Sequence, residues 1–130
     1  MNANFVECVR FAEEEYQVAV FLMKRRGGNA LMNSICFHCQ QCLEWYLKGR
    51  LQRAGLPIPK THNLAVLLDQ VLSLEPMWAS FETSVATVKN YTADFLYPGH
   101  VATPKQAREA LKICQSIRKE IRLALGLSAK

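Results

Sequence analysis

Hydrophobic residues recur at spacings of three and four along almost the whole chain, and no segment alternates strictly over the length of a strand. This spacing is typical of amphipathic α-helices. It predicts about five helices, four long and one shorter. Because the connections between them are short, we expect an all-α, antiparallel up-and-down helical bundle. Residues 1–130 are enough for a single domain with one substantial core.

Glycine and asparagine mark the ends of the first two helices. The first is expected from about Asn4 to Arg26, where Gly27-Gly28 stops it. The second is expected from about Ala30 to Ala54, with Asn29 as its N-cap and Gly55 just past its end.

Proline and threonine punctuate the second half of the chain. A third helix is expected to start near Thr61 or His62. Pro76 suits the first turn of a fourth helix, which Pro98-Gly99 ends. The fifth has the clearest start, because Thr103, Pro104 and Gln106 form a capping-box pattern. Gly126 ends this helix.

Three cysteines follow each other at spacing three in the second helix, next to His38. They fall on its apolar face, where a free cysteine behaves as a small hydrophobic residue. A zinc site usually brings a second ligand pair from elsewhere in the chain, and no Cys-x-x-Cys or His-x-x-x-His partner exists here. We therefore favour packing over a metal site and expect no metal; the cysteines are Cys36, Cys39 and Cys42.

Composition narrows the class of protein. Half of the residues are hydrophobic and 21% are charged, which favours a folded globular chain. No apolar run is long enough to cross a bilayer, and the N-terminus is too acidic for a signal peptide. We expect a cytoplasmic protein without a membrane partner or a cofactor. The net charge of +5 is compatible with a nucleic-acid partner but does not require one.

Polar residues interrupt the apolar pattern of the second helix and read Q-Q-x-x-E-x-x-L-K-x-x-L from Gln40 to Leu51. This stretch resembles the signature helix of the HEPN domain family. The segment K-T-H-N-L at 60–64 is similar to the family's K-T-H-D-L, and N-Y-T-A-D-F-L-Y-P at 90–98 is similar to its D-Y-x-V-E-A-R-Y-P. The three motifs occur in the family's order, and the resemblance covers nearly the whole chain.

The resemblance implies an antiparallel helical bundle that commonly forms a homodimer and is associated with nucleotides or RNA. It also implies a nucleotidyltransferase partner, because many members are paired with a minimal nucleotidyltransferase in toxin–antitoxin systems. Some members are metal-independent ribonucleases that use an Arg and a His separated by four to six residues.

This chain departs from the ribonuclease pattern. Leu96 stands where the family has the Arg of R-Y-P, and no Arg or Lys occurs from Asn90 to Gly99. None of the three histidines has an Arg at the ribonuclease spacing before it. A guanidinium would stabilise the charge that builds on the phosphate, and losing such a group typically costs about 10²–10³ in rate. We expect that the chain is not catalytic alone.

Two groups of candidate residues remain. The first group could form the polar lining of a nucleotide-binding cleft between helices. The alternatives are that Glu44 and Lys48 form a surface ion pair and that His62 caps a helix. Its members are Gln40, Gln41, Glu44, Lys48, Lys60 and His62. The second is either a remnant of the family's active groove or an ordinary helix end, and comprises the catalytic candidates His100, Tyr97 and Asp94.

Basic residues on the fifth helix form either a solvated face, which we favour, or a phosphate-binding stripe; they are Arg108, Lys112, Arg118, Lys119 and Arg122. Apolar area that includes Trp45, Tyr46, Phe95 and Tyr97 is expected to be buried partly against a second copy of the chain. The preferred function is a nucleotide- or RNA-associated binding module. The alternatives are a ribonuclease toxin with a rearranged site at His100, and a substrate-holding subunit of a nucleotidyltransferase.

Overall fold

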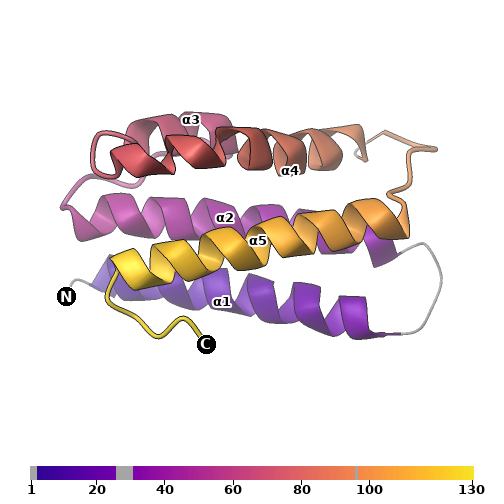
Figure 1. Cartoon of the computed structure of the whole chain (residues 1–130), viewed down its shortest axis with the longest axis horizontal. Helices are drawn as coiled ribbons and strands as arrows, with labels where there is room; N and C mark the ends of the chain where they lie inside the picture. Colours follow the sequence, from indigo (N-terminus) through magenta and orange to yellow (C-terminus); the bar gives the residue numbers. More distant parts are fainter. Residues whose placement is uncertain (1–2, 26–30, 96) are drawn as a thin grey trace.

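A computed structural model describes residues 3–25, 31–95 and 97–130, and all regular structure in them is helical. In Figure 1, α1 and α2 run antiparallel, as do α4 and α5, and the short α3 lies beside α4. The predicted all-α bundle is confirmed. Among the described residues, no helix is long and apolar enough to cross a membrane. The elements are α1 (Ala3–Lys24), α2 (Met32–Arg53), α3 (Leu64–Val71), the 3₁₀-helix η2 (Pro76–Phe81), α4 (Glu82–Asp94) and α5 (Pro104–Ala124).

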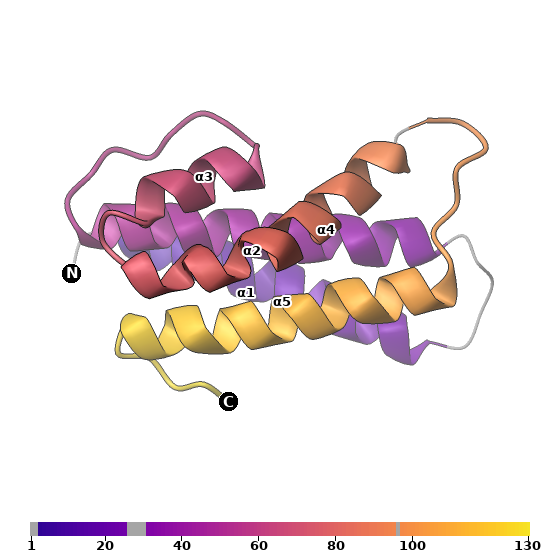
Figure 2. The ribbon, with the colours of Figure 1, turned by 45° about the horizontal axis from the view of Figure 1, so that its top comes forward.

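Helix α2 is the centre of the bundle and packs against each of α1, α3, α4 and α5. Figure 2 shows it running behind α4 and between α1 and the α3–α4 layer. More than half of its residues are buried, because it is enclosed on several sides. The remaining helices each bury one stripe at helical spacing; in α5 this stripe is Ala107, Ala110, Leu111, Cys114, Ile117, Arg118 and Ile121.

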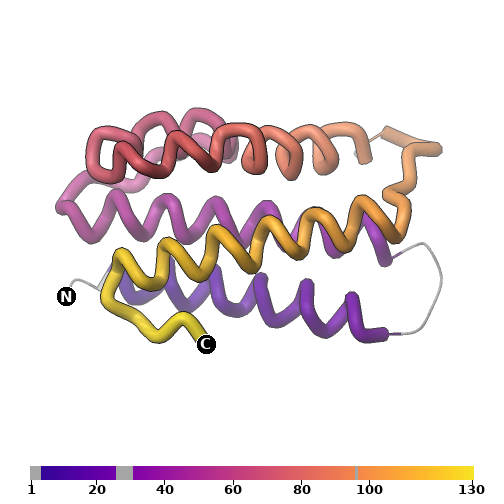
Figure 3. The backbone as a smooth tube through the Cα atoms, in the orientation of Figure 1, coloured from indigo at the N-terminus to yellow at the C-terminus, as the bar shows by residue number. Residues whose placement is uncertain are grey.

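Helices α1 and α2 approach each other closely at one glycine. A methyl group added at Gly49 would lie 3.3 Å from the Cβ of Cys8, which is tighter than ordinary van der Waals contact. Small residues on both sides make this approach feasible, since Ala12 and Ala19 are also fully buried on the facing stripe of α1. The backbone traces of the two helices run side by side over most of their length in Figure 3.

The helix boundaries differ from the predicted ones by a few residues. Helix α1 ends at Lys24 rather than at Arg26. The predicted stop at residues 27–28 and the predicted N-cap Asn29 lie outside the described residues. Gly55 follows α2 with a φ of +81°, a conformation that glycine adopts without strain and that commonly ends helices.

Asn63, and not Thr61 or His62, begins the third helix. The Asn63 side-chain oxygen accepts hydrogen bonds from the backbone N–H groups of Ala65 and Val66, at 3.0 and 3.4 Å. The α-helix therefore starts at Leu64.

The predicted fourth helix also needs correction, because its first turns are a 3₁₀-helix from Pro76 to Phe81. The proline does occupy the first turn, but the α-helix begins only at Glu82 and ends at Asp94.

The predicted start of α5 is confirmed in detail. Thr103 Oγ1 accepts a hydrogen bond from the Gln106 backbone N–H at 3.1 Å, and Gln106 Oε1 accepts one from the Thr103 N–H at 2.9 Å. Pro104 takes the first helical position, where its missing N–H costs nothing. At the other end, Gly126 has a φ of +75°.

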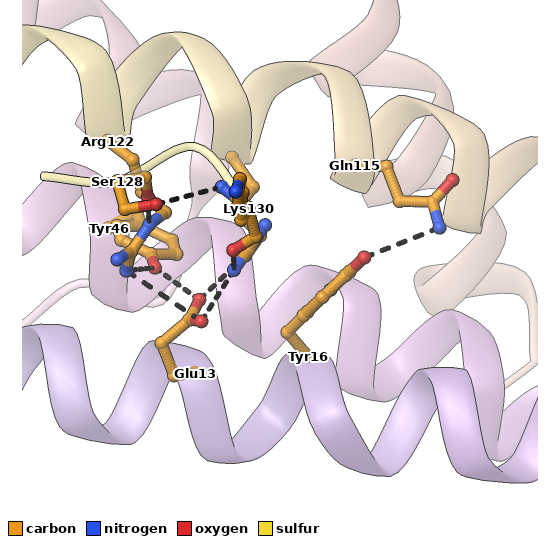
Figure 4. A network of polar contacts seen from close by, with 8 residues as sticks. Glu13, Tyr16, Tyr46, Gln115, Arg122, Ser128 and Lys130 are labelled. Carbon is orange, nitrogen blue, oxygen red and sulfur yellow. Dashed lines mark hydrogen bonds and ion pairs between the residues drawn. The ribbon is translucent and has the colours of Figure 1, made fainter.

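A polar network ties α1, α2 and α5 together around the carboxylate of Glu13 (Figure 4). This carboxylate accepts hydrogen bonds from Arg118 and from the hydroxyl of Tyr46, and Arg122 donates to the same hydroxyl at 2.9 Å. Arg118 also donates to the backbone oxygen of Lys130, which holds the C-terminal segment against α5. The predicted solvated basic face is thus wrong for two residues, since Arg118 is buried and Arg122 is half-buried, whereas Arg108, Lys112 and Lys119 are exposed.

Candidate functional site

Glu44 and Lys48 form an ion pair in the interior of the protein. Lys48 Nζ lies 2.9 Å from Glu44 Oε2, and the two side chains are 4% and 1% exposed, respectively. Reading this pair as a surface ion pair is therefore wrong. Its burial comes from the packing of other helices on α2, because the i, i+4 spacing alone would leave the pair in water. A buried charge requires hydrogen-bonding or charged partners, so the groups around the Glu44 carboxylate are described next.

His62 is the second partner of the same oxygen. Its Nδ1 lies 2.9 Å from Glu44 Oε2, although its side chain is 79% exposed. The imidazole reaches this position from the non-helical segment between α2 and α3, just before the cap residue Asn63. Lys60 is exposed on the same segment. The structure thus brings His62 to Glu44, and it assigns the capping role to Asn63.

Two buried side-chain oxygens on this part of α2 have no hydrogen-bond donor among the described residues. They are Oε1 of Gln40 and Oε1 of Glu44. Because these residues are four apart, they lie one helical turn apart on the same face of α2. Leaving a buried acceptor unpaired costs about 1–3 kcal/mol, and more for a charged group. The site therefore has an unused capacity to accept hydrogen bonds.

Lys48 also contacts an aromatic ring of its own helix. Its Nζ lies 5.2 Å from the centre of the Trp45 ring, and that ring contacts Phe11 of α1 at a centroid distance of 5.0 Å. In such cation–π contacts the ammonium is attracted by the ring. Gln41, the remaining candidate on this helix, is half-buried. The ion pair is thus positioned by α1 as well as by its own helix.

The cysteine stretch packs as predicted. Cys36, Cys39 and Cys42 are all 0% exposed and belong to the hydrophobic core, and all five cysteines of the chain are free thiols. Cys114 of α5 lies within hydrogen-bonding range of Cys39 and Cys42. The Cys114 thiol, together with burial, raises the pKa of Cys39, and burial followed by the same contact raises that of Cys42. Within residues 3–25, 31–95 and 97–130, no group of three or more His, Cys, Asp or Glu side chains could hold a metal ion.

The second group of candidates lies away from Glu44, in the last turn of α4 and in the segment that follows it. Asp94, Tyr97 and His100 are all exposed, and the rings of Tyr97 and His100 meet edge-on with centroids 6.1 Å apart. The His100 N–H donates to the Tyr97 carbonyl at 3.2 Å, which closes a turn around Gly99. Leu96, which replaces the family's Arg, lies outside the described residues.

Asn33, which the sequence did not single out, fixes this turn to α2. Its Nδ2 donates to the His100 carbonyl at 3.2 Å, and its Oδ1 accepts from the Ala102 N–H at 2.6 Å. One amide in the first turns of α2 thus clamps the backbone on both sides of Val101. The only signal in the sequence is an asparagine at the start of a helix, which is too common to indicate a partner nearly seventy residues away.

Two cavities border α4. One, of about 210 Å³, is lined by Asn33, Ser34, Phe37, Thr92 and Phe95, and lies next to the turn that Asn33 clamps. The other, of about 540 Å³, lies between α3 and α4 and is lined by Ala65, Val66, Leu68, Asp69, Gln70, Glu82 and Val85. Neither includes Glu44, whose carboxylate is enclosed.

The two candidate groups are separate, and they meet α2 at different places, at Asn33 and at Glu44. Asn33 and Glu44 are eleven residues apart, which is about 16 Å along an α-helix. The structure therefore brings Glu44, Lys48 and His62 together, and it does not bring His100 to them.

Comparison with known proteins gives one match. The family model for the HEPN domain matches residues 5–124, which span α1 to α5 and both candidate groups. No curated protein and no solved structure matches the chain.

Proposed function

The chain belongs to the HEPN domain family, which is generally associated with nucleotides or RNA, and on this premise we propose that it is a nucleotide- or RNA-binding module rather than an independent ribonuclease. The observation that carries the proposal is the buried Glu44 carboxylate, which has one unpaired oxygen, as does the side chain of Gln40 four residues earlier. We further propose that residues 1–130 act as one cytoplasmic domain.

Ligand binding can use the Glu44 site with the groups that it has, whereas ribonuclease catalysis would need a cation that it lacks. Glu44 is already paired with Lys48 and His62 through one oxygen, which leaves the other free to accept from a ligand. A ribonuclease site needs a cation where charge builds on the phosphate. The Glu44 carboxylate has the wrong sign for that task, and the segment from Asn90 to Gly99 carries no basic residue.

Entry to the site follows from exposure. The His62 imidazole is largely exposed and contacts Oε2 of Glu44, so we propose that a ligand reaches the carboxylate when this one side chain rotates away. Lys60 is two residues away and also exposed, in a position suited to a phosphate group of the ligand.

Titration calorimetry with nucleoside mono- and triphosphates tests the proposal. We expect binding by the natural protein and at least tenfold weaker binding by Glu44→Gln, because a hydrogen bond to a charged acceptor contributes about 1.5–3 kcal/mol. Glu120→Gln is the matched control, since Glu120 is exposed on α5. Equal affinity of Glu44→Gln and the natural protein would show that the ligand does not use this carboxylate.

We also propose that the protein acts as a homodimer and as the partner of a separately encoded nucleotidyltransferase in a toxin–antitoxin-type pair. Exposed apolar side chains near the start of α2 and the end of α4 support a protein interface, namely Phe37, Tyr97 and Val101. Tyr46 is 0% exposed within its own bundle and is therefore not part of this surface, contrary to the expectation from sequence. Light scattering that gives a monomer at micromolar concentration would contradict the dimer.

The second candidate function is a metal-independent ribonuclease with a rearranged site, supported by the clamp of Asn33 on His100 and by the neighbouring Tyr97. An RNA cleavage assay without metal, on the natural protein, His100→Ala and Leu96→Arg, separates the two functions. The binding module predicts no cleavage by the natural protein. Cleavage by the natural protein that disappears in His100→Ala would establish the ribonuclease instead.

A further inference from the structure

The groove between α3 and α4 is the larger of the two cavities described above and takes no part in the proposed function. Its volume of about 540 Å³ lies within the range of about 300–1,000 Å³ that is typical of binding pockets. Four of its lining residues are apolar, namely Ala65, Val66, Leu68 and Val85, and Val66 is 42% exposed. The groove therefore offers apolar surface to a molecule outside the bundle.

Two carboxylates line the same groove, one from each helix. Asp69 lies near the end of α3 and Glu82 in the first turn of α4, and both are exposed. Within the described residues, neither side chain takes part in a hydrogen bond or an ion pair. By contrast, Glu75, which lies between the two helices in sequence, is paired with Arg50 of α2 at 3.1 Å. The groove thus presents two negative charges that the described chain leaves without a counter-charge.

The layer that contains this groove is opposite in charge to the rest of the chain. Helices α3 and α4 lie side by side in the layer farthest from α1 (Figure 1). Residues 64–95, which include both helices and η2, carry four acidic side chains and one basic side chain, a net charge of −3. The whole chain carries +5, so the remaining residues carry +8. A nucleic acid is attracted to the second part and repelled by the first, whereas a cationic partner suits the α3–α4 layer.

The recurring modes of peptide recognition narrow the shape of such a partner. Strand addition needs the edge of a sheet, and regular structure in the described residues is entirely helical. Proline-rich segments dock on aromatic grooves, and none of the described residues that line this groove is aromatic. Phosphorylated segments need a cluster of arginines, where this groove has Asp69 and Glu82. An amphipathic helix laid between two helices is the mode that fits.

We propose that the α3–α4 groove docks a basic, amphipathic helix of a partner protein. The apolar face of that helix packs against Ala65 and Val66, which are both exposed. Lys or Arg side chains beside this face pair with Asp69 and Glu82. Met77 adds apolar surface to the same layer, because it is 84% exposed on η2, which packs against both helices. Methionine adapts its shape to varied partners and is common at docking surfaces.

A second copy of the chain is a less suitable occupant of the groove. The acidic layer of one copy would meet a basic face of the next, and a contact between two different faces closes into a ring or continues as an open chain of molecules. The proposed homodimer uses a different surface, around Phe37, Tyr97 and Val101. Glu82 precedes Asp94 by twelve residues, about 18 Å along α4, so the groove lies away from that surface.

Fluorescence anisotropy with three labelled peptides, all designed as helices, tests the proposal. The first peptide has leucines at i, i+3, i+4 and i+7 flanked by Lys and Arg. The second has the same composition in an order without an apolar stripe, and the third has Glu in place of every Lys and Arg. We expect the natural protein to bind the first peptide at least tenfold more tightly than the other two, with an affinity that falls as salt is added.

Groove variants and a charge-matched control locate the binding. The double variant Asp69→Asn, Glu82→Gln should bind the first peptide about tenfold more weakly than the natural protein, and so should Val66→Lys, which places a like charge in the groove. The double variant Glu14→Gln, Glu120→Gln removes the same charge from exposed positions of α1 and α5 and should keep the natural affinity. Circular dichroism checks that each variant is folded.

Equal binding of the first two peptides overturns the proposal, and so does equal affinity of the groove variants and the control, because the attraction would then be general. Absence of binding by all three peptides overturns it as well. Self-association that disappears in Asp69→Asn, Glu82→Gln would assign the groove to a second copy instead. Nucleotide affinity should be unchanged in that variant, since the groove does not include Glu44; a loss would assign the groove to the nucleotide and overturn the proposal.

Discussion

Arg118 of α5 forms a bidentate ion pair with Glu13 of α1, in which two nitrogens donate to two oxygens. Its Nε donates to Oε2 at 2.7 Å and its Nη2 donates to Oε1 at 2.6 Å. The guanidinium also lies over the Tyr16 ring, 4.2 Å from its centre. Paired hydrogen bonds of this kind fix orientation as well as distance, so the contact sets how α5 docks on α1.

Breaking this pair from one side should destabilise the bundle. Arg118→Ala leaves a partly buried carboxylate without its main partner, and we expect a loss of about 3 kcal/mol in the free energy of unfolding. Urea denaturation measures it. The double variant Arg118→Met, Glu13→Leu should recover much of the loss, because the unpaired charge is then gone; no recovery would show that packing of the arginine dominates.

Stability should fall in acid through Glu13. Burial alone would raise the pKa of its carboxyl, but hydrogen bonds from Arg118 and Tyr46 outweigh burial and the pKa is lowered. A lowered pKa stabilises the fold above the unfolded value of about 4.3, and this contribution disappears as the pH falls through the folded-state pKa. Unfolding free energies measured from pH 7 to pH 3 should therefore decline less in Glu13→Gln than in the natural protein. Parallel declines would assign the acid sensitivity to other carboxyls.

The start of α5 offers a test of local capping. Thr103→Ala removes the acceptor for the Gln106 N–H and should cost about 1 kcal/mol, or a fall of roughly 3–4 °C in Tm. Calorimetry should show a smaller effect for Thr87→Ala, whose hydroxyl bonds to a carbonyl within an already formed helix. A larger effect there would mean that the cap contributes little.

Asn33→Ala should loosen the turn that carries His100. Both hydrogen bonds of the amide are lost, and at about 1 kcal/mol each the local opening becomes roughly 10–30-fold more frequent. Hydrogen exchange at the Ala102 amide reports it directly, with the Ala107 amide in α5 as an internal reference. Unchanged protection at Ala102 would show that the turn is held by other contacts.

The core position of Cys39 predicts opposite outcomes for two substitutions. Cys39→Ala removes one sulfur from a fully buried site and should cost about 1–2 kcal/mol, whereas Cys39→Asp places an unpaired charge there and should prevent folding. Circular dichroism distinguishes the two. Loss of folding in Cys39→Ala together with release of a metal would overturn the packing interpretation.

The sequence predicted what depends on neighbours along the chain. The Thr103–Gln106 capping box and the buried cysteine stripe follow from spacings of three and four, and both are present. It did not predict what distant segments bring together. The burial of Glu44 and Lys48 depends on helices that pack over α2, and the clamp of Asn33 depends on a turn 67–69 positions away.

Two further residues, Pro76 and Arg118, were predicted only in part, because their structure depends on contacts that the local sequence does not show. Pro76 marked the correct turn, but the choice between a 3₁₀-helix and an α-helix over Pro76–Phe81 was not readable from hydrophobic spacing. Arg118 looked like other basic residues of α5 until Glu13 of α1 was placed opposite it.

The central position of α2 restricts how this protein can change. Each candidate position on that helix has a core residue within one turn, for example Gln40 with Leu43 and Glu44 with Leu47. A substitution that alters ligand preference is therefore also a substitution at the edge of the core, and its acceptance depends on the stability held in reserve elsewhere. A change in ligand specificity should therefore require compensating substitutions on α1 and α5. Mutations on α2 should then show strong epistasis with positions that do not contact a ligand.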